Sequence, residues 1–152
     1  VVAGVSLSQV LYALPLTTAT SAAAAESSQT SKAISWVGLA VSLVGLVLEH
    51  IADEQKMSAK RRDPSSPVMT GLYSFCRHPN YLGEVLFHLG VICLGARGSL
   101  GRFCVNSIGP LFMVQIMFGA AKRLDREGMQ KYGNSNIYNE WFNKTPCIKP
   151  RV

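Results

Sequence analysis

The sequence predicts an all-α fold, a polytopic membrane helix bundle with about four transmembrane helices and a C-terminal interfacial helix. Hydrophobic residues make up 48% of the chain and charged residues only 16%, whereas soluble domains carry roughly 25% charged residues. The hydrophobic residues are gathered into blocks, and several blocks approach the roughly 20 residues that a helical span requires. The length of 152 residues fits a single domain.

The blocks place four expected spans along the chain, at about residues 1–20, 33–51, 79–96 and 103–121, ahead of a polar tail, 122–152. A low-complexity polar linker, 20–32, separates the first two spans. In the second span, the spacing of Gly38 and Gly45 suits close packing of helices, although glycines are also simply tolerated in a bilayer. Pro110 is expected to kink the fourth span.

Basic residues predict the orientation. The loop between the second and third spans holds five of them, and the tail holds seven, so 12 of the 15 basic residues share one side of the membrane. The positive-inside rule directs that side toward the cytoplasm or its equivalent in an organelle, the stroma or matrix. We therefore expect an integral, multi-pass protein of the endoplasmic reticulum or an organellar membrane.

Several functional classes are excluded by motifs that the sequence lacks. The net charge of +6 is not accompanied by any nucleic-acid-binding motif, so no nucleic-acid partner is expected. The four cysteines are scattered without metal-ligand spacing, so no metal is expected. There is no Gly-x-Gly, Walker loop, His-Glu-x-x-His or Gly-x-Ser-x-Gly.

The stretch from Thr70 to Glu84 is the most informative, because polar residues there run directly into an apolar segment. A residue that precedes a proline avoids the helical conformation, so His78 should end one element and Pro79 should begin the next. Arg77 and His78 then lie beside a helix N-terminus, which favours anions. The concentration of basic and polar residues suits a phosphate-bearing cofactor or an anionic headgroup, with the reactive part of a lipid approaching from the bilayer.

The new helix carries polar side chains into the apolar segment. Tyr81, Glu84 and His88 recur at three- and four-residue steps and therefore share one face. A carboxylate and an imidazole on a membrane helix are costly to bury unless they meet a partner or a ligand.

The motif Arg77-His78-Pro79-Asn80-Tyr81-x-Gly83-Glu84 resembles the signature of a large membrane superfamily. That superfamily contains sterol reductases, steroid 5-alpha-reductase-like proteins and isoprenylcysteine carboxyl methyltransferases. The flanks, Glu49-x-x-Ala52-Asp53-x-Gln55-Lys56 and Gly71-Leu72-Tyr73, are similar to the 5-alpha-reductase-like branch of unassigned function. The tail resembles a terminal motif that reductases and methyltransferases share. The residues that carry this resemblance are Arg123-x-x-x-Glu127, Tyr132-Gly133, Tyr138, Trp141 and Pro146.

The resemblance implies NADPH-dependent reduction of a carbon–carbon double bond in a sterol or isoprenoid lipid. It assigns catalysis to Tyr81 and Glu84, and cofactor binding to Lys56, Lys60, Arg77, His78, Asn80, Arg123, Glu127, Tyr138 and Trp141. Membrane lipids and a lipid-like substrate are the implied partners. The alternative for the central motif is purely structural: residues 78–84 would hold the hinge against the tail.

Two other functions stay open. In methyltransferase members the same region holds S-adenosylmethionine, whose methyl group would be transferred to a lipid or a prenylated cysteine. A non-catalytic accessory subunit of a large photosynthetic or respiratory complex would bind neither cofactor and would contact other membrane subunits. Two departures bear on this choice: Phe87-His88 stand where the branch places paired tryptophans, and the family's N-terminal helices are not matched by this sequence.

Overall fold

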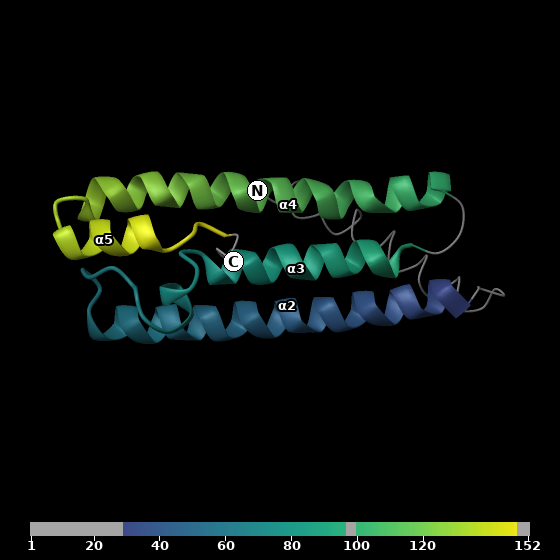
Figure 1. Cartoon of the computed structure of the whole chain (residues 1–152), viewed down its shortest axis with the longest axis horizontal. Coiled ribbons are helices and arrows are strands. Elements are labelled where there is room, and N and C mark those ends of the chain that lie inside the picture. The colour runs from purple at the N-terminus through teal and green to yellow at the C-terminus, as the bar shows by residue number, and fades with distance from the viewer. Residues whose placement is uncertain (1–28, 97–99, 149–152) are drawn as a thin grey trace. The chain divides into compact units, whose positions relative to one another are not determined.

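The computed structural model describes residues 29–96 and 100–148, and these residues form helices and connecting segments without any strand (Figure 1). The first predicted span lies outside the described residues. The helices are α2 (Gln29–Arg62), the short 3-10 helix η1 (Gly71–Ser74), α3 (Pro79–Leu94), α4 (Leu100–Tyr132) and α5 (Asn136–Lys144). The all-α prediction is confirmed for this part of the chain.

The described residues fall into two compact units. Unit 1 contains residues 29–44, 85–96 and 100–115, and unit 2 contains residues 45–84 and 116–148. Helices α2, α3 and α4 each contribute one part to unit 1 and another to unit 2, whereas η1 and α5 belong to unit 2 alone.

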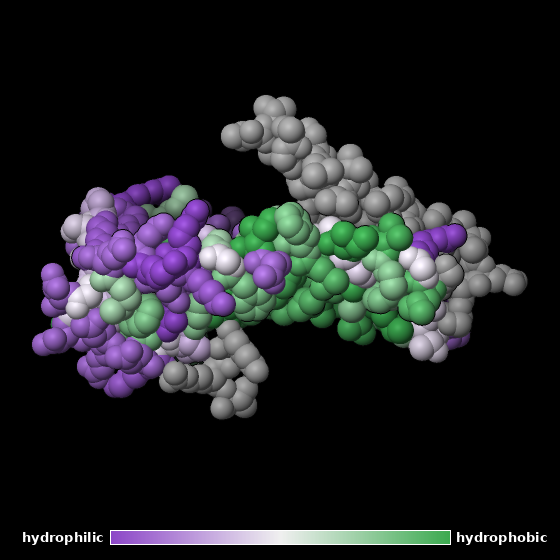
Figure 2. Space-filling model, turned by 90° about the horizontal axis from the view of Figure 1, so that it is seen from above, coloured by the Kyte–Doolittle hydropathy of each residue, from purple (hydrophilic) through white to green (hydrophobic). Residues whose placement is uncertain are grey.

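Two of these helices, α2 and α4, are long and apolar enough to cross a membrane. Only 22% of the apolar window of α2 and 28% of that of α4 is buried, whereas the core helix of a soluble protein is mostly buried. The hydrophobic residues form a continuous surface on the face seen in Figure 2. Helix α3 is apolar but has 16 residues, fewer than the roughly 20 that a straight span needs. Of the three predicted spans that fall within the described residues, two are therefore long and apolar enough to cross a membrane.

The helix ends differ from the predicted spans. Helix α2 begins at Gln29, inside the expected linker, and continues past residue 51 to Arg62. Helix α4 begins at Leu100, ahead of the expected span at 103–121, and runs past residue 121 to Tyr132. The polar extensions contain good helix formers such as Lys, Arg and Gln and no proline. The predicted polar tail therefore contains the last turns of α4. After them it contains α5, a separate C-terminal helix.

Helix α3 begins at Pro79, as predicted, whereas the preceding element, η1, ends at Ser74 and not at His78. Gly71 has a φ of 64°, a left-handed conformation that glycine adopts without strain. The Gln55 side chain lies directly beside Gly71. Its Oε1 accepts a 2.9 Å hydrogen bond from the Leu72 N–H. The hinge, residues 70–78, is therefore anchored to α2 at its first turn.

Glycines let α2 and α3 approach each other closely within each unit. In unit 1, a Cβ on Gly90 would lie 2.5 Å from the Gly38 carbonyl oxygen and 2.6 Å from the Ser42 nitrogen. In unit 2, a Cβ on Gly83 would lie 2.6 Å from the Gly45 carbonyl oxygen. Such backbone contacts leave no room for a side chain, so the predicted packing role of Gly38 and Gly45 agrees with the geometry.

Substituting Gly90 tests this packing. We expect Gly90→Ala to lower the free energy of unfolding by about 1–3 kcal/mol, because the new methyl group must push two backbones apart. The matched control is Gly119→Ala, where the added Cβ meets nothing within 4 Å and the gain in helix propensity should leave stability equal or higher. Thermal unfolding of both variants in detergent provides the measurement, and equal melting temperatures would contradict close packing at Gly90.

Candidate functional site

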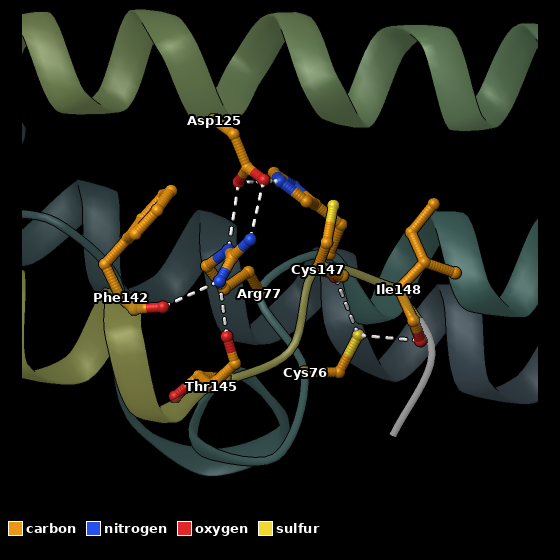
Figure 3. Close-up of polar contacts among 8 residues, drawn as sticks. Cys76, Arg77, Asp125, Phe142, Thr145, Cys147 and Ile148 are labelled. Atoms are coloured by element: carbon orange, nitrogen blue, oxygen red, sulfur yellow. Dashed lines mark hydrogen bonds and ion pairs between the residues drawn. The ribbon is translucent and has the colours of Figure 1, made fainter. Parts of the chain in front are cut away.

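The side chains of Arg77 and His78 both contact Asp125 of α4 within unit 2. Figure 3 shows the pair of Arg77 and Asp125. The Arg77 guanidinium donates from Nε to Oδ1 at 3.1 Å and from a terminal nitrogen to Oδ2 at 2.8 Å. His78 Nε2 lies 2.8 Å from Oδ1. The Arg77 and Asp125 side chains are only 13% and 15% exposed, so this bidentate pair is largely shielded from water.

The remaining donors of Arg77 hold the C-terminal segment, residues 136–148. The second terminal nitrogen donates to the carbonyl oxygens of Phe142, at 2.7 Å, and Thr145. The guanidinium also lies over the Phe142 ring, 4.0 Å from its centroid, a favourable arrangement for a cation and an aromatic face. One side chain of the hinge therefore contacts both α4 and the C-terminal segment.

Backbone contacts strengthen the same connection. The Arg77 N–H donates to the Pro146 carbonyl oxygen at 2.9 Å, and the His78 N–H donates to that of Cys147 at 3.1 Å. Trp141 of α5 donates from its indole nitrogen to the Tyr73 carbonyl oxygen at 2.9 Å. The hinge and the C-terminal segment thus form one hydrogen-bonded layer, which agrees at His78 with the structural alternative for residues 78–84.

Burial and hydrogen bonding decide the protonation states of Asp125 and His78. Burial alone would raise the pKa of Asp125, but hydrogen bonds from Arg77 and His78 outweigh it and hold the pKa below its ordinary value. Burial lowers the pKa of His78 despite the neighbouring carboxylate. His78 is therefore neutral near pH 7, and its contact with Asp125 is a hydrogen bond from Nε2–H rather than an ion pair.

Cys147 completes the surroundings of Asp125. Among the described residues, His78, Asp125 and Cys147 have possible ligand atoms within 4.8 Å of one another. Burial, followed by the hydrogen bond to Asp125, raises the pKa of the Cys147 thiol to about 11, so it is protonated in the metal-free protein. The Arg77 cation already pairs with the Asp125 carboxylate, so a metal ion would have to compete with it there.

A pocket of about 240 Å³ opens beside this cluster, within unit 2. Its lining combines basic and aromatic side chains with the cluster, and includes Lys56, Lys60, Lys131, Tyr132, Tyr138 and Trp141. The Tyr138 ring centroid lies 5.4 Å from those of Tyr132 and Trp141. A larger pocket of about 400 Å³ lies between α2 and the loop that follows it, but it contains none of the predicted site residues.

The predicted cofactor-binding residues divide into two sets. The pocket is lined by Lys56, Lys60, Arg77, His78, Glu127, Tyr138 and Trp141, whereas Asn80 and Arg123 do not line it. Arg123 instead forms an exposed pair with Glu127 at 3.6 Å. Lys60 donates to the carbonyl oxygens of Pro64 and Ser66 and to the Tyr132 hydroxyl, so its three N–H groups are used within the protein.

The predicted catalytic residues lie on α3, outside the pocket lining. The Tyr81 ring is stacked on that of His78, with the centroids 5.7 Å apart. Glu84 follows Gly83, which packs against the backbone of Glu49 on α2. Both residues are half-buried, and Tyr81 reaches the site through its contact with His78.

Asp125 was not among the predicted site residues, and neither were Lys131 and Tyr132. Helical spacing contained the signal: Ala121 is fully buried, and Asp125, Gly128 and Tyr132 follow it at steps of three and four residues. The inward face of α4 therefore predicts Asp125, whereas our expectation rested on Arg123 and Glu127, which lie on the exposed face.

Removing the charge of Asp125 should unfold the site. We expect Asp125→Asn to lower the free energy of unfolding by about 3–5 kcal/mol, because the Arg77 cation stays buried without its anion. In the control, Glu140→Gln breaks a pair with Lys144 that lies in solvent and should not change stability measurably. Denaturant unfolding in detergent gives both values. Equal stability of Asp125→Asn and wild type would refute the central role of the pair.

The same cluster predicts how stability depends on pH. The pKa of His78 is lowered from 6.5, so only the unfolded chain takes up this proton near that pH, and stability should fall below about pH 6.5. The pKa of Asp125 is lowered from 3.8, so a further loss is expected as the pH falls below about 4. We expect melting temperatures measured from about pH 2 to pH 8 to show both losses. In His78→Gln the loss near pH 6.5 should be reduced, and an unchanged profile would exclude His78 as its origin.

Comparison with known proteins places this architecture in a family. No curated protein and no solved structure matches the chain significantly. A family model described as "Protein of unknown function (DUF1295)" matches residues 2–145, a range that covers the described helices, the hinge and α5. The chain therefore belongs to the DUF1295 family.

Proposed function

We propose that this protein is a multi-pass membrane oxidoreductase that uses NADPH to reduce a carbon–carbon double bond in a sterol or isoprenoid lipid. The observation that carries the proposal is the pocket of unit 2, where lysines and aromatic rings share one concave surface. A dinucleotide presents phosphates and flat rings, and these are the groups that such a surface recognises.

Lys56 and Lys131 are the cations best suited to the phosphates. Lys56 lines the pocket without a hydrogen bond or an ion pair to any residue that the structure describes, and Lys131 contacts only the Tyr132 ring and hydroxyl. Lys60, by contrast, is committed to the loop after α2 and positions Tyr132. The two other lysines can therefore turn toward an anion at little cost to the fold.

Tyr132, Tyr138 and Trp141 supply stacking surfaces beside these lysines. Their rings are held in place, because Tyr138 is buried and the Trp141 indole is bonded to the hinge. The volume of about 240 Å³ lies below the roughly 300–1,000 Å³ of sites that enclose a drug-sized ligand. The pocket thus suits one part of the cofactor, its phosphates and an adjoining ring.

The basic lining favours NADPH over S-adenosylmethionine. S-adenosylmethionine carries a cationic sulfonium and no phosphate, so Lys56 and Lys131 would repel it rather than bind it. An accessory subunit, which would bind neither cofactor, needs no such lining.

NADPH would supply the hydride for one carbon of the double bond, and a protein group must supply a proton to the other. Tyr81 and Glu84 are our candidates for that proton, since both lie on α3 directly after the hinge and acids at that position can be re-protonated from solvent. His78 stacks on the Tyr81 ring and is itself fixed by Asp125. His78 therefore orients Tyr81 instead of holding a phosphate.

The apolar helices suit a substrate that approaches through the bilayer. The exposed hydrophobic surface of α2 and α4 would face lipid, and the basic loop and tail would face the cytoplasm, stroma or matrix. Membrane lipids would then surround unit 1 and would also supply the substrate.

Two lysine variants test the proposal. We expect Lys56→Gln and Lys131→Gln each to weaken NADPH binding by about 10-fold to 100-fold, the effect of losing one charge-assisted hydrogen bond of about 1.5–3 kcal/mol. Melting temperatures should not change, since neither lysine holds the fold. Lys144→Gln, on the exposed face of α5, is the matched control and should bind normally.

Native mass spectrometry of the gently solubilised protein reads the result directly. Retention of an NADPH mass that both pocket variants lose would support the reductase. Retention of S-adenosylmethionine would establish methyl transfer instead. A protein that binds neither and is found only within a large complex would be an accessory subunit.

A further inference from the structure

Unit 2 contains a second pocket, of about 400 Å³, that the proposed nucleotide site does not use. One wall of this pocket is α2, where Glu54, Ser58 and Arg62 follow one another at four-residue steps and therefore share one face. The opposite wall comes from residues 68–71. The volume lies within the roughly 300–1,000 Å³ that is typical of sites for small molecules.

The loop that follows α2 is attached to this helix at two places. Lys60 Nζ donates to two backbone carbonyl oxygens near the start of the loop, and Gln55 Oε1 accepts from the Leu72 N–H at its end. Residues 68–71 lie between these attachments, beside the pocket. Val68 lines this pocket and the nucleotide pocket alike. The loop is therefore held in place as a partition between the two cavities.

The polar side chains of the second pocket have no partner in the part of the chain that the structure describes. Those of Glu54, Ser58, Arg62 and Thr70 are exposed and make no hydrogen bond or ion pair to any described residue. Glu54 and Arg62 line one cavity without pairing with each other, because eight residues of helix separate their Cα atoms by about 12 Å. The pocket thus presents an anion and a cation that are held apart.

The wall between the two charges is partly apolar. Ala59 of α2 and Val68 of the loop both line the pocket, and methylene groups gain free energy by packing against such side chains. If each charged end of a ligand lies about 2.8 Å from its partner, a ligand that joins Glu54 to Arg62 measures about 6 Å between its ends. That length corresponds to a short aliphatic chain.

The position along α2 indicates that such a ligand comes from water. Ser58, at the middle of the stripe, lies seven residues beyond the expected end of the span at residue 51, which is about 10 Å along the helix axis. The headgroup layer on each side of a bilayer is about 5–8 Å thick. The centre of the pocket therefore lies beyond the lipid headgroups.

We propose that this pocket binds a small soluble zwitterion, with an ammonium group at Glu54, a carboxylate at Arg62 and a short aliphatic chain between them. The hydroxyls of Ser58 and Thr70 can accept from the ammonium group or donate to the carboxylate. The site is separate from the nucleotide pocket, and it does not depend on the proposed reductase activity.

Three probes of equal chain length test the charge pattern: 5-aminopentanoate, pentane-1,5-diamine and pentanedioate. Each is titrated into the full chain in detergent at one ionic strength, and its affinity is obtained from the rise in melting temperature. We expect the zwitterion to bind about 5-fold to 10-fold more tightly than either other probe, since each of those brings a like charge to Glu54 or Arg62. Equal affinities, a preference for the diamine or the dicarboxylate, or no binding at all would overturn the proposal.

Variants assign the two ends of the ligand. Glu54→Gln should remove the advantage of the zwitterion over pentanedioate, and Arg62→Gln should remove its advantage over the diamine. The double variant Glu54→Arg with Arg62→Glu should bind the zwitterion in the opposite orientation. Without ligand the melting temperatures should not change, since both side chains are exposed. A preference for the zwitterion that survives in both single variants would refute the site.

Two controls locate the effect in this pocket. Arg61→Gln removes a neighbouring exposed arginine that is not part of the lining, and it should keep the full preference for the zwitterion. Lys131→Gln alters only the nucleotide pocket and should bind the zwitterion like the wild type. A loss of zwitterion binding in Lys131→Gln would place the probe in the nucleotide pocket and would contradict a second site.

Discussion

Burial of the Arg77 guanidinium would be prohibitively costly without Asp125, and unit 2 is arranged around the need to place that carboxylate. The hinge presents the arginine, α4 supplies the aspartate, and the C-terminal segment supplies the carbonyl oxygens of Phe142 and Thr145. Each element depends on the other two, because a bidentate pair requires both partners in a fixed orientation. The pocket wall formed by His78, Tyr138 and Trp141 then follows from this arrangement.

The long extension of α4 beyond its apolar part is a consequence of the same constraint. A helix that ended near residue 121 could not carry Asp125, Gly128 and Tyr132 on one face toward the hinge. Gly128 allows this approach, because a Cβ there would collide with the Tyr138 hydroxyl. The polar end of α4 is therefore part of the site and not a solvated tail, and any ligand of the pocket must contact a surface that the Arg77–Asp125 pair has already made rigid.

The sequence was informative wherever one local rule dominates. Pro79 begins α3 because proline suits a first helical turn, and Gly38 and Gly83 pack closely because they lack side chains. It was less informative where partners are distant: Asp125 lies 48 residues from Arg77, and no local pattern relates a carboxylate to an arginine so far away. The length of the third predicted span was also beyond hydropathy alone, since α3 ends at Leu94 and has 16 residues, fewer than the roughly 20 of a straight span.

Unit 1 and unit 2 treat polar groups in opposite ways, and this difference follows from their surroundings. In unit 2, the Arg77 side chain makes four hydrogen bonds and a ring contact. These contacts offset the free-energy cost of burying its charge. In unit 1 the serines bond to carbonyl oxygens of the helices, and a donor such as Asn106 Nδ2 stands out because nothing in an apolar environment replaces a missing acceptor.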